Sequence, residues 1–276
     1  KEDVVARKQV RHTLTERTIL ERVRHPFIVP LHYAFQSRSS LYLVMALQSG
    51  GELFFHLRRE GAFSEARVRL YAAEILLALD ALHCAHFMYR DLKPENILLD
   101  SEGHVRLSDF GLAKEISGAL NSGGITFCGT PSYMAPEVLL GTGHGIAVDW
   151  WSFGTLIYET LAGAPPFYSK NLHLMYRAIL CGEVRWPSSI SRQARTLLEG
   201  LLMRDPLKRL GGQGASQIQR HKFFKGVDFR QVLARDCKPL FQPILVGASP
   251  SAQALDTTNF DSTFTAEKHT ESETDL

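Results

Sequence analysis

The chain has 276 residues, of which 45% are hydrophobic and 22% are charged, and its formal net charge at pH 7 is +2. This composition is ordinary for a globular protein, and the length allows one large domain or two lobes around a shared cleft. The small charge argues against binding to nucleic acid, and the lack of a long apolar run argues against membrane insertion.

The first part of the chain predicts a helix followed by two strands. Residues 4–24 carry apolar side chains at helical spacing, and Pro26 disfavours helical geometry in the residue before it, so we expect the helix to end before His25. "FIVPLHYAF" and "LYLVMALQ" then predict two strands joined by the polar turn "QSRSS". The apolar positions expected on the buried face of the helix are Val10, Leu14, Ile19 or Leu20, and Val23.

The rest of the chain is predicted to be mainly helical. Residues 66–86 repeat apolar side chains on one helical face, and two short strands, "NILLD" and "HVRLSDF", follow around the turn "SEG". From about residue 149 the pattern is helical again, as in "DWWSFGTLIYETLAG" and "RQARTLLEGLLMR". The last fifteen or so residues are polar and rich in Ser and Thr, and we expect them to be flexible.

The cysteines bear on the cellular compartment. Cys84, Cys128, Cys181 and Cys237 are far apart and form no CxxC pair, which disfavours a metal site or a disulfide framework. Reduced thiols suit a cytoplasmic protein, and a nuclear location is also compatible with them.

The stretch "YRDLKPENILL" carries the chemistry. Transfer of a γ-phosphoryl group requires metal ligands, a group that orients the attacking hydroxyl, and cations that hold the phosphates. Asp91 can accept the proton of a hydroxyl, Lys93 can contact the γ-phosphate, and Asn96 can offer an oxygen to Mg²⁺, with Asp109 of "DFG" as a second ligand. Each residue alone is more simply a solvated turn or a helix cap, but the whole string at this spacing favours the catalytic reading.

Together with "FCGTPSYMAPE", "DWWSFG" and "NFDSTFT", these motifs resemble eukaryotic protein kinases of the AGC group. "HTLTERTIL" and "FIVPLHYAFQS" are most similar to the serum/glucocorticoid-regulated kinases and their fungal counterparts. The resemblance covers essentially the whole chain and implies an α+β, bilobal protein-kinase fold. It implies a remainder of the small lobe up to the hinge in 1–46, a mainly helical large catalytic lobe in 47–224, and part of the AGC C-terminal extension, partly disordered, in 225–276.

The resemblance implies ATP and Mg²⁺ as cofactors. Met45, Ala46 and Leu47 match the hinge, whose backbone binds adenine, so the replacement of a common acidic residue by Ala46 should have little effect. Phe260 matches a tail aromatic that reaches the adenine pocket. The positions assigned to ATP in this way are Met45, Ala46, Leu47, Glu52, Glu95, Asn96, Leu98, Ser108, Asp109 and Phe260, with Asn96 and Asp109 as the metal ligands.

Two further elements of an active kinase are matched. Glu16 corresponds to the helix-C glutamate that pairs with the ATP-anchoring lysine, although a lone helical glutamate is usually a solvated charge. A stacked apolar column that joins the lobes in the active state is matched by Leu20, Leu31, Tyr89 and Phe110, which could equally be plain core residues.

The activation loop is matched by "TFCGTPSYMAPE". Thr126 corresponds to the phosphothreonine that an upstream activating kinase modifies, with an unmodified loop threonine as the alternative. Its phosphate would be bound by Arg90, Lys114 and His12. Thr130 matches the residue that hydrogen-bonds the catalytic aspartate.

The resemblance also implies a substrate class. Glu52, Glu95 and Glu159 match carboxylates that receive arginines placed before the target Ser or Thr, since arginine binds carboxylates through charge-assisted hydrogen bonds. Ser132 stands where many relatives have glutamate, which puts the preference for more distant arginines in doubt. Glu137 and Arg209 match a buried ion pair beneath the substrate platform.

Two parts of a complete kinase do not occur in these 276 residues: a glycine-rich phosphate loop and a "VAIK"-type strand. Lys1 is a poor candidate for the anchoring lysine, because "KEDVV" is not strand-like and lies too close to Glu16. We therefore expect a fragment of an active kinase. The alternative is a pseudokinase-like binding scaffold that lacks the loop and the lysine.

Overall fold

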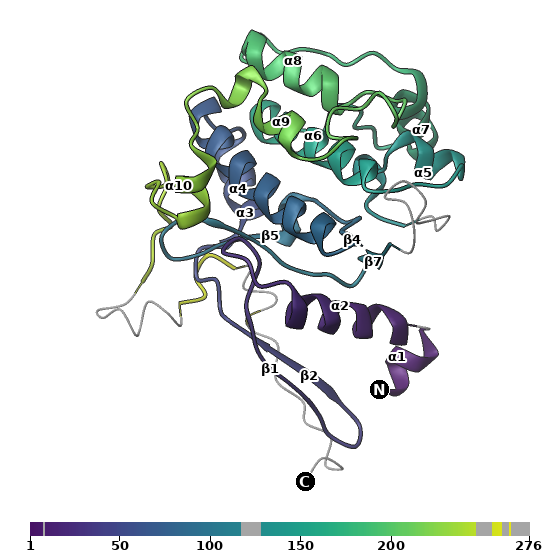
Figure 1. Cartoon of the computed structure of the whole chain (residues 1–276), viewed down its shortest axis with the longest axis vertical. Helices are drawn as coiled ribbons and strands as arrows, with labels where there is room; N and C mark the ends of the chain where they lie inside the picture. The colour runs from purple at the N-terminus through teal and green to yellow at the C-terminus, as the bar shows by residue number, and fades with distance from the viewer. Residues whose placement is uncertain (8, 117–127, 247–255, 261–264, 266–276) are drawn as a thin grey trace.

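The computed structural model describes residues 1–7, 9–116, 128–246, 256–260 and 265. A smaller part contains the helices α1 (Glu2–Ala6) and α2 (Val10–Arg22) and the strands β1 (Leu31–Gln36) and β2 (Leu41–Met45). In Figure 1 this part lies below a larger, mainly helical part, and α2 runs beneath β4 and β7. None of the described helices is both long enough and apolar enough to cross a membrane.

The single helix predicted for residues 4–24 is wrong, since the chain forms two helices there. The backbone N–H of Gln9 donates to the carbonyl of Val4 at 2.8 Å, five residues back, and this wider turn separates α1 from α2. The predicted buried face is also only partly confirmed. Ile19 is fully buried, but Val10 and Leu14, nearer the start of α2, are 43% and 58% exposed.

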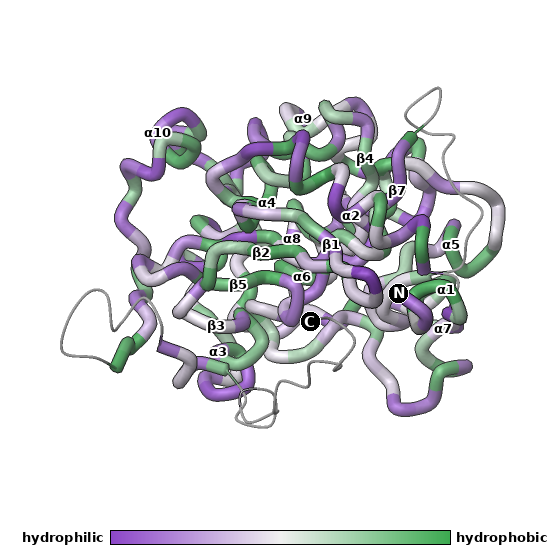
Figure 2. Tube along the Cα trace, turned by 90° about the horizontal axis from the view of Figure 1, so that it is seen from below, coloured by the Kyte–Doolittle hydropathy of each residue, from purple (hydrophilic) through white to green (hydrophobic). Residues whose placement is uncertain are grey.

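The two predicted strands form an antiparallel hairpin, which confirms that part of the prediction. Strand β1 begins only at Leu31, although an isolated parallel bridge between Ile28 and Leu107 joins the preceding segment to the large part. Figure 2 shows β2 mainly in the green of hydrophobic residues. Leu41, Val44 and Met45 of this strand are nevertheless 43%, 40% and 39% exposed. Among the described residues, β2 pairs only with β1.

Helices α4 (Glu65–Cys84) and α6 (Ala147–Ala162) form the centre of the large part. The helix predicted for residues 66–86 is confirmed as α4, which begins where the Ser64 hydroxyl accepts a hydrogen bond from Arg67 N. Nearly all residues of α6 are buried, and Trp150 has no exposed surface. The other helical elements are α3 (Leu53–Glu60), α5 (Pro136–Leu140), α7 (Leu172–Cys181), α8 (Arg192–Leu201), α9 (Ser216–Gln219), α10 (Phe229–Ala234), η1 (Pro94–Asn96), η2 (Pro131–Tyr133) and η3 (Lys222–Phe224).

Two small sheets hold the loops that carry the predicted chemistry. Strands β3 (Gly51–Glu52), β5 (Ile97–Leu99) and β6 (Val105–Leu107) form one antiparallel sheet in the order β3-β5-β6. Strands β4 (Phe87–Met88) and β7 (Lys114–Glu115) form the other. The loop with Asp91 therefore leaves β4 and returns into β5, and Asp109 follows the end of β6.

The C-terminal segment packs closely against the large part. The Asn259 side-chain amide donates to the carbonyl of Ser49 at 3.0 Å, across 210 positions of the chain. A Cβ on Gly51, whose φ is +72°, would lie 2.1 Å from the carbonyl oxygen of Asn259, and a Cβ on Gly103 would lie 2.0 Å from that of Phe241. Glycine is needed at both positions because the C-terminal backbone occupies the space of a side chain.

Candidate active site

Asp91 lies at the centre of a compact group of polar side chains. Its carboxylate is 6% exposed and accepts hydrogen bonds from Lys93 Nζ at 2.9 Å and Asn96 Nδ2 at 2.8 Å. The Thr130 hydroxyl donates to the other carboxylate oxygen at 3.2 Å, so the hydrogen bond expected of Thr130 is confirmed. The structure therefore brings Asp91, Lys93 and Asn96 together, with one face of the group formed by the segment after the activation loop.

A buried carboxylate on α6 holds the backbone of this loop. Asp149, which has no exposed surface, accepts from the backbone N–H groups of Tyr89 at 2.9 Å and Arg90 at 2.7 Å. His83 Nε2 lies 2.7 Å from the same carboxylate. Arg90 has a φ of +66°, an unfavourable conformation for a residue with a side chain, and these hydrogen bonds stabilise it.

Sequence reasoning did not assign a role to Asp149 or His83. The signal available was the placement of Asp149 at the start of the motif "DWWSFG", which was read only as part of the family resemblance.

Asp109 and Asn96 have the chemistry of magnesium ligands. The amide nitrogen of Asn96 donates to the backbone carbonyl and to the carboxylate of Asp91. Its Oδ1 is the atom that could bind a metal ion. Asp109 is exposed, has a φ of +50°, and accepts from Gly111 N at 3.0 Å. Mg²⁺ prefers oxygen ligands and usually keeps several waters and substrate phosphates, so these two donors fit it. No cluster of three His, Cys, Asp or Glu ligands exists among the described residues.

Glu16 of α2 faces this site. Burial raises the pKa of its carboxyl, and the negative charge of Asp109 raises it further, whereas the backbone N–H of Phe110 favours the ionised form. Lys1 lies elsewhere, because its Nζ donates to the carbonyl of Ser37 at 2.6 Å, in the turn of the hairpin. Glu16 therefore lies near Asp109 and Phe110, and its pairing with a lysine stays a prediction.

Part of the predicted apolar column is assembled. The rings of Tyr89 and Phe110 have centroids 5.4 Å apart, and the Tyr89 hydroxyl donates to the carbonyl of Ser108 at 2.5 Å. Leu20 is buried and Leu31 is half-buried, and both border one cavity between α2 and β1.

The residues matched to the hinge lie at the end of β2. Met45 and Leu47 are exposed, and Ala46 N donates to the carbonyl of Pro30 at 3.1 Å. The Ala46 carbonyl accepts from Gln48 Nε2 at 2.9 Å, and a carbonyl can accept a second hydrogen bond. The Ala46 carbonyl therefore keeps room for one more donor, and the assignment of these residues to adenine stays a prediction.

The other positions matched to ATP are spread around the same loops. Glu52 of β3 is the register partner of Leu98 of β5. The backbone N–H and the hydroxyl of Ser108 both donate to the carbonyl of Asn96 at 3.0 Å. Phe260 is half-buried and follows Asn259, which is bound to Ser49.

Glu95 and Glu159 form an acidic pair beside η2. Glu159 is 8% exposed and accepts a short hydrogen bond from the Tyr133 hydroxyl. Burial raises the pKa of Glu159, and the negative charge of Glu95 raises it further, while the Tyr133 donor lowers it. Glu95 Oε2 is buried and has no hydrogen-bond partner in the part of the chain that the structure describes. A cation placed here would satisfy that oxygen and would be attracted by both carboxylates.

Three cationic side chains, those of Lys114, Arg90 and Arg11, lie near one another. Burial lowers the pKa of Lys114, and the positive charges of Arg90 and Arg11 lower it further. Arg11 was not predicted, although it stands next to His12, which is half-buried on α2. Thr126 lies outside the described residues. The place of these cations is consistent with an anion-binding role, which stays a prediction.

The predicted ion pair beneath this region is confirmed. Arg209 is 2% exposed, and its two terminal nitrogens donate to the two carboxylate oxygens of Glu137 at 2.6 and 2.8 Å. It also donates to the carbonyls of Met203 and Ala147, both at 2.8 Å. The pair joins α5 to the segment after α8.

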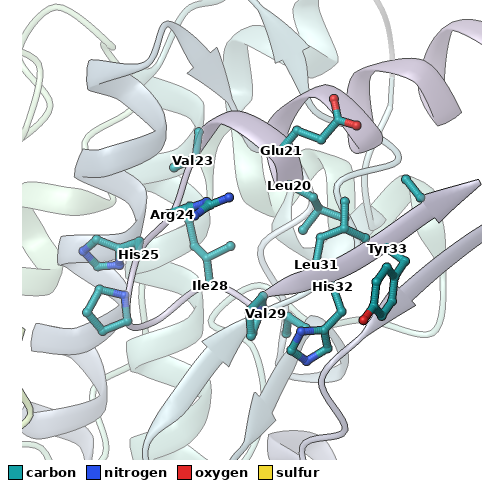
Figure 3. Close-up of a pocket in the computed structure, with 13 residues that line it drawn as sticks. Leu20, Glu21, Val23, Arg24, His25, Ile28, Val29, Leu31, His32 and Tyr33 are labelled. Carbon is teal, nitrogen blue, oxygen red and sulfur yellow. The ribbon is translucent and has the colours of Figure 1, made fainter.

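A cavity of about 710 Å³ lies away from the catalytic loop, between the end of α2 and β1. Figure 3 shows Arg24 and His25 on one side of it and His32 and Tyr33 on the other. Burial lowers the pKa of His25 to about 4, so this side chain is neutral at pH 7. The cavity contains none of the predicted catalytic or metal-binding side chains.

Residues 1–224 match the family described as "Protein kinase domain". "Protein kinase 2" of Dictyostelium discoideum is 57% identical over 243 residues, which are 88% of this chain and 50% of that protein. "Serine/threonine-protein kinase gad8" of Schizosaccharomyces pombe is 51% identical over 97% of this chain and 46% of its own length. "Serine/threonine-protein kinase YPK2/YKR2" of Saccharomyces cerevisiae is 49% identical over 99% of this chain and 39% of its own length.

The chain spans half or less of the length of these three curated relatives. Over that span, the family match covers the loop with Asp91, the metal-ligand candidates and the Glu137–Arg209 ion pair in one domain. The chain belongs to the protein kinase family, in its AGC group of serine/threonine kinases close to the fungal YPK1, YPK2 and gad8 proteins.

Proposed function

We propose that the complete protein transfers the γ-phosphoryl group of ATP to Ser or Thr residues of other proteins. The observation that carries this proposal is the convergence of Lys93, Asn96 and Thr130 on the carboxylate of Asp91. Three donors on one carboxylate fix its direction, and positioning supplies most of the catalysis in phosphoryl transfer.

Each residue has a defined task in this reaction. Asp91 accepts the proton of the substrate hydroxyl, and Lys93, bound to Asp91 at 2.9 Å, neutralises charge on the transferred phosphoryl group. Asn96 and Asp109 would hold a magnesium ion, which would supply positive charge to shield the phosphates of ATP. Met45, Ala46 and Leu47 place the adenine, and Phe260 covers it from the C-terminal segment.

The proposed substrates carry arginine before the target Ser or Thr. Two observations on Glu95 and Glu159 support this class. One oxygen of Glu95 is buried without a partner among the described residues, and the negative charge of Glu95 acts on the carboxyl of Glu159. An arginine guanidinium offers five N–H donors in a planar fork and suits such a pair. Glu52 is proposed as a further carboxylate of this group.

We expect Glu159→Gln to raise the KM for an arginine-containing peptide by about tenfold, because charge-assisted hydrogen bonds are lost. The wild-type preference for this peptide should also weaken as the pH falls toward 4.5, the ordinary pKa of a glutamate carboxyl, because burial raises the pKa of Glu159 and its protonation begins above that value. Assays of peptide libraries from about pH 4.5, the ordinary pKa of a glutamate carboxyl, to about pH 8 measure both effects.

The matched control is Glu183→Gln, which changes an exposed glutamate. A peptide with alanine in place of arginine should be insensitive to Glu159→Gln. If the ratio of the KM values for the two peptides is the same in Glu159→Gln as in the wild type, Glu159 does not bind the substrate arginine.

Activity is proposed to depend on phosphorylation of Thr126 by an upstream kinase. Three neighbouring positive charges support this proposal, namely those of Arg90, Lys114 and Arg11. Lys114 lies two positions before residue 116, the last described residue ahead of Thr126. Thr126→Ala should lower kcat strongly, and phosphatase treatment should lower the wild-type kcat to a similar level. A phosphatase-treated wild type that keeps full activity would contradict this regulation.

We also propose that strands outside residues 1–276 complete the small lobe and supply the phosphate loop and the lysine. The exposed apolar side chains of β2, a strand paired only with β1 among the described residues, support this. Residues 1–276 alone should therefore convert ATP to ADP much more slowly than the complete protein does, which an assay of ADP formation measures. If the complete protein converts ATP no faster than residues 1–276 do, a pseudokinase-like binding scaffold becomes the better interpretation of its function.

A further inference from the structure

A small, partly open cavity lies between the catalytic loop and the segment that begins at Cys128. Its volume is about 20 Å³, and its lining includes Arg90, Cys128 and His144. His144 belongs to the loop between α5 and α6 and is 4% exposed. The cavity is separate from the hinge, the metal-ligand candidates and the acidic pair of Glu95 and Glu159.

Arg90 and His144, which both line this cavity, each have one buried nitrogen, Nη1 and Nε2, without a hydrogen-bond partner among the described residues. The rest of Arg90 is fixed, since its Nε donates to the carbonyl of Leu112 at 2.8 Å and its backbone N–H donates to Asp149 at 2.7 Å. Arg90 therefore cannot easily turn its guanidinium to find another acceptor. Buried polar atoms are nearly always paired, with protein or with ordered water.

The volume of the cavity and the chemistry of the two nitrogens both favour a water molecule as the ligand. A site for one water needs about 10–15 Å³ and two to four polar partners, and the cavity of about 20 Å³ meets the first condition. Arg90 can only donate, whereas the Nε2 of a neutral histidine can accept, and a water molecule can satisfy both at once. The thiol of Cys128 offers a third, weaker partner on the same wall.

We propose that one ordered water bridges Arg90 Nη1 and His144 Nε2, and that His144 acts through it as a positioning residue for Arg90. The bridge fixes the second side of the guanidinium, while Leu112 fixes the first. The location of the water depends only on the cavity and its two nitrogens. Its effect on catalysis rests on the proposed function, in which Arg90 binds the phosphate of the activation loop.

Burial and nearby charges keep His144 neutral, the state in which a ring nitrogen can accept a hydrogen bond. Burial lowers its pKa from 6.5, and the positive charges of Arg90 and Lys114 lower it further. The negative charges of Glu137 on α5 and Asp149 on α6 act in the opposite direction. His144 is therefore neutral at pH 7, and protonation at lower pH removes the acceptor that the bridge needs.

The first test is a structure of the complete protein at a resolution that shows ordered water. Density is expected within about 2.7–3.2 Å of both nitrogens in the wild type. It should persist in His144→Gln, which keeps a polar atom near Nε2, and should be lost in His144→Leu. A wild-type structure without this density, or with a protein acceptor on Arg90 Nη1, would overturn the proposal.

The second test is kinetic. His144→Leu should lower kcat about tenfold with the KM for ATP unchanged, and His144→Gln should restore most of it. The wild type should lose kcat at a pH below 6.5 more steeply than His144→Gln does. His173→Leu, a change of an exposed histidine on α7, is the control and should have no effect.

Equal kcat values for all three histidine variants would overturn the positioning role. An inactive wild type would instead contradict the proposed function, while the density would still report on the water.

Discussion

Replacing Asp91 by asparagine should lower kcat by roughly 10²–10⁴-fold, the usual contribution of a positioned acid–base group. Asparagine has nearly the same shape, so Thr130 can still donate to its oxygen, but it cannot take up the proton of the substrate hydroxyl. The Kd for Mg-ATP should stay nearly unchanged, since Asp91 lies between Lys93 and Asn96 and is not itself assigned to the metal. Peptide phosphorylation and nucleotide titration on the complete protein measure the two quantities separately.

Asp236→Asn is the matched control, because Asp236 is exposed near the end of α10 and takes no part in the site. It should leave both kcat and the Kd unchanged. Loss of nucleotide binding in Asp91→Asn, with or without loss of kcat, would mean that Asp91 holds magnesium and that the proton acceptor is another group.

Replacing Glu137 by alanine should destabilise the fold by about 3–5 kcal/mol, because it leaves the guanidinium of Arg209 buried without its carboxylate. Arg209 is 2% exposed and uses two nitrogens on Glu137 at 2.6 and 2.8 Å. The carbonyls of Met203 and Ala147 remain as acceptors, but neither neutralises the charge. Urea unfolding followed by tryptophan fluorescence measures the difference.

A surface ion pair provides the comparison for this result. Arg195 and Glu199 of α8 are 51% and 48% exposed in their side chains, so Glu199→Ala should change stability by less than about 1 kcal/mol. The double variant Glu137→Leu with Arg209→Met should be more stable than Glu137→Ala, since no charge remains buried. Equal effects of Glu137→Ala and Glu199→Ala would show that burial does not set the strength of the Glu137–Arg209 pair.

Features that depend on neighbours in the sequence could be predicted. The apolar period of residues 66–86 led directly to α4, and the spacing of Asp91, Lys93 and Asn96 placed three polar groups in one loop that the structure brings into contact. In both cases the contacts that matter form within a few residues of each other, so pattern and geometry coincide.

Features that depend on distant contacts could not be predicted in this way. Asp149 holds Arg90 across 59 positions, and nothing local to either residue shows it. The exposure of Leu14 depends on what packs against α2, which periodicity does not report. Arg11 was missed because a charged helical residue has no distinguishing pattern until Lys114 is placed beside it.

The attachment of Asn259 to Ser49 matters for anyone who prepares shorter versions of this protein. A version that stops after α10 would uncover Gly51 and Gly103, whose missing side chains make sense only beneath the C-terminal backbone. Such a truncated version would expose the backbone at Gly51 and Gly103 to screening compounds. Inhibitors selected against it would then be matched to a shape that the longer polypeptide does not offer.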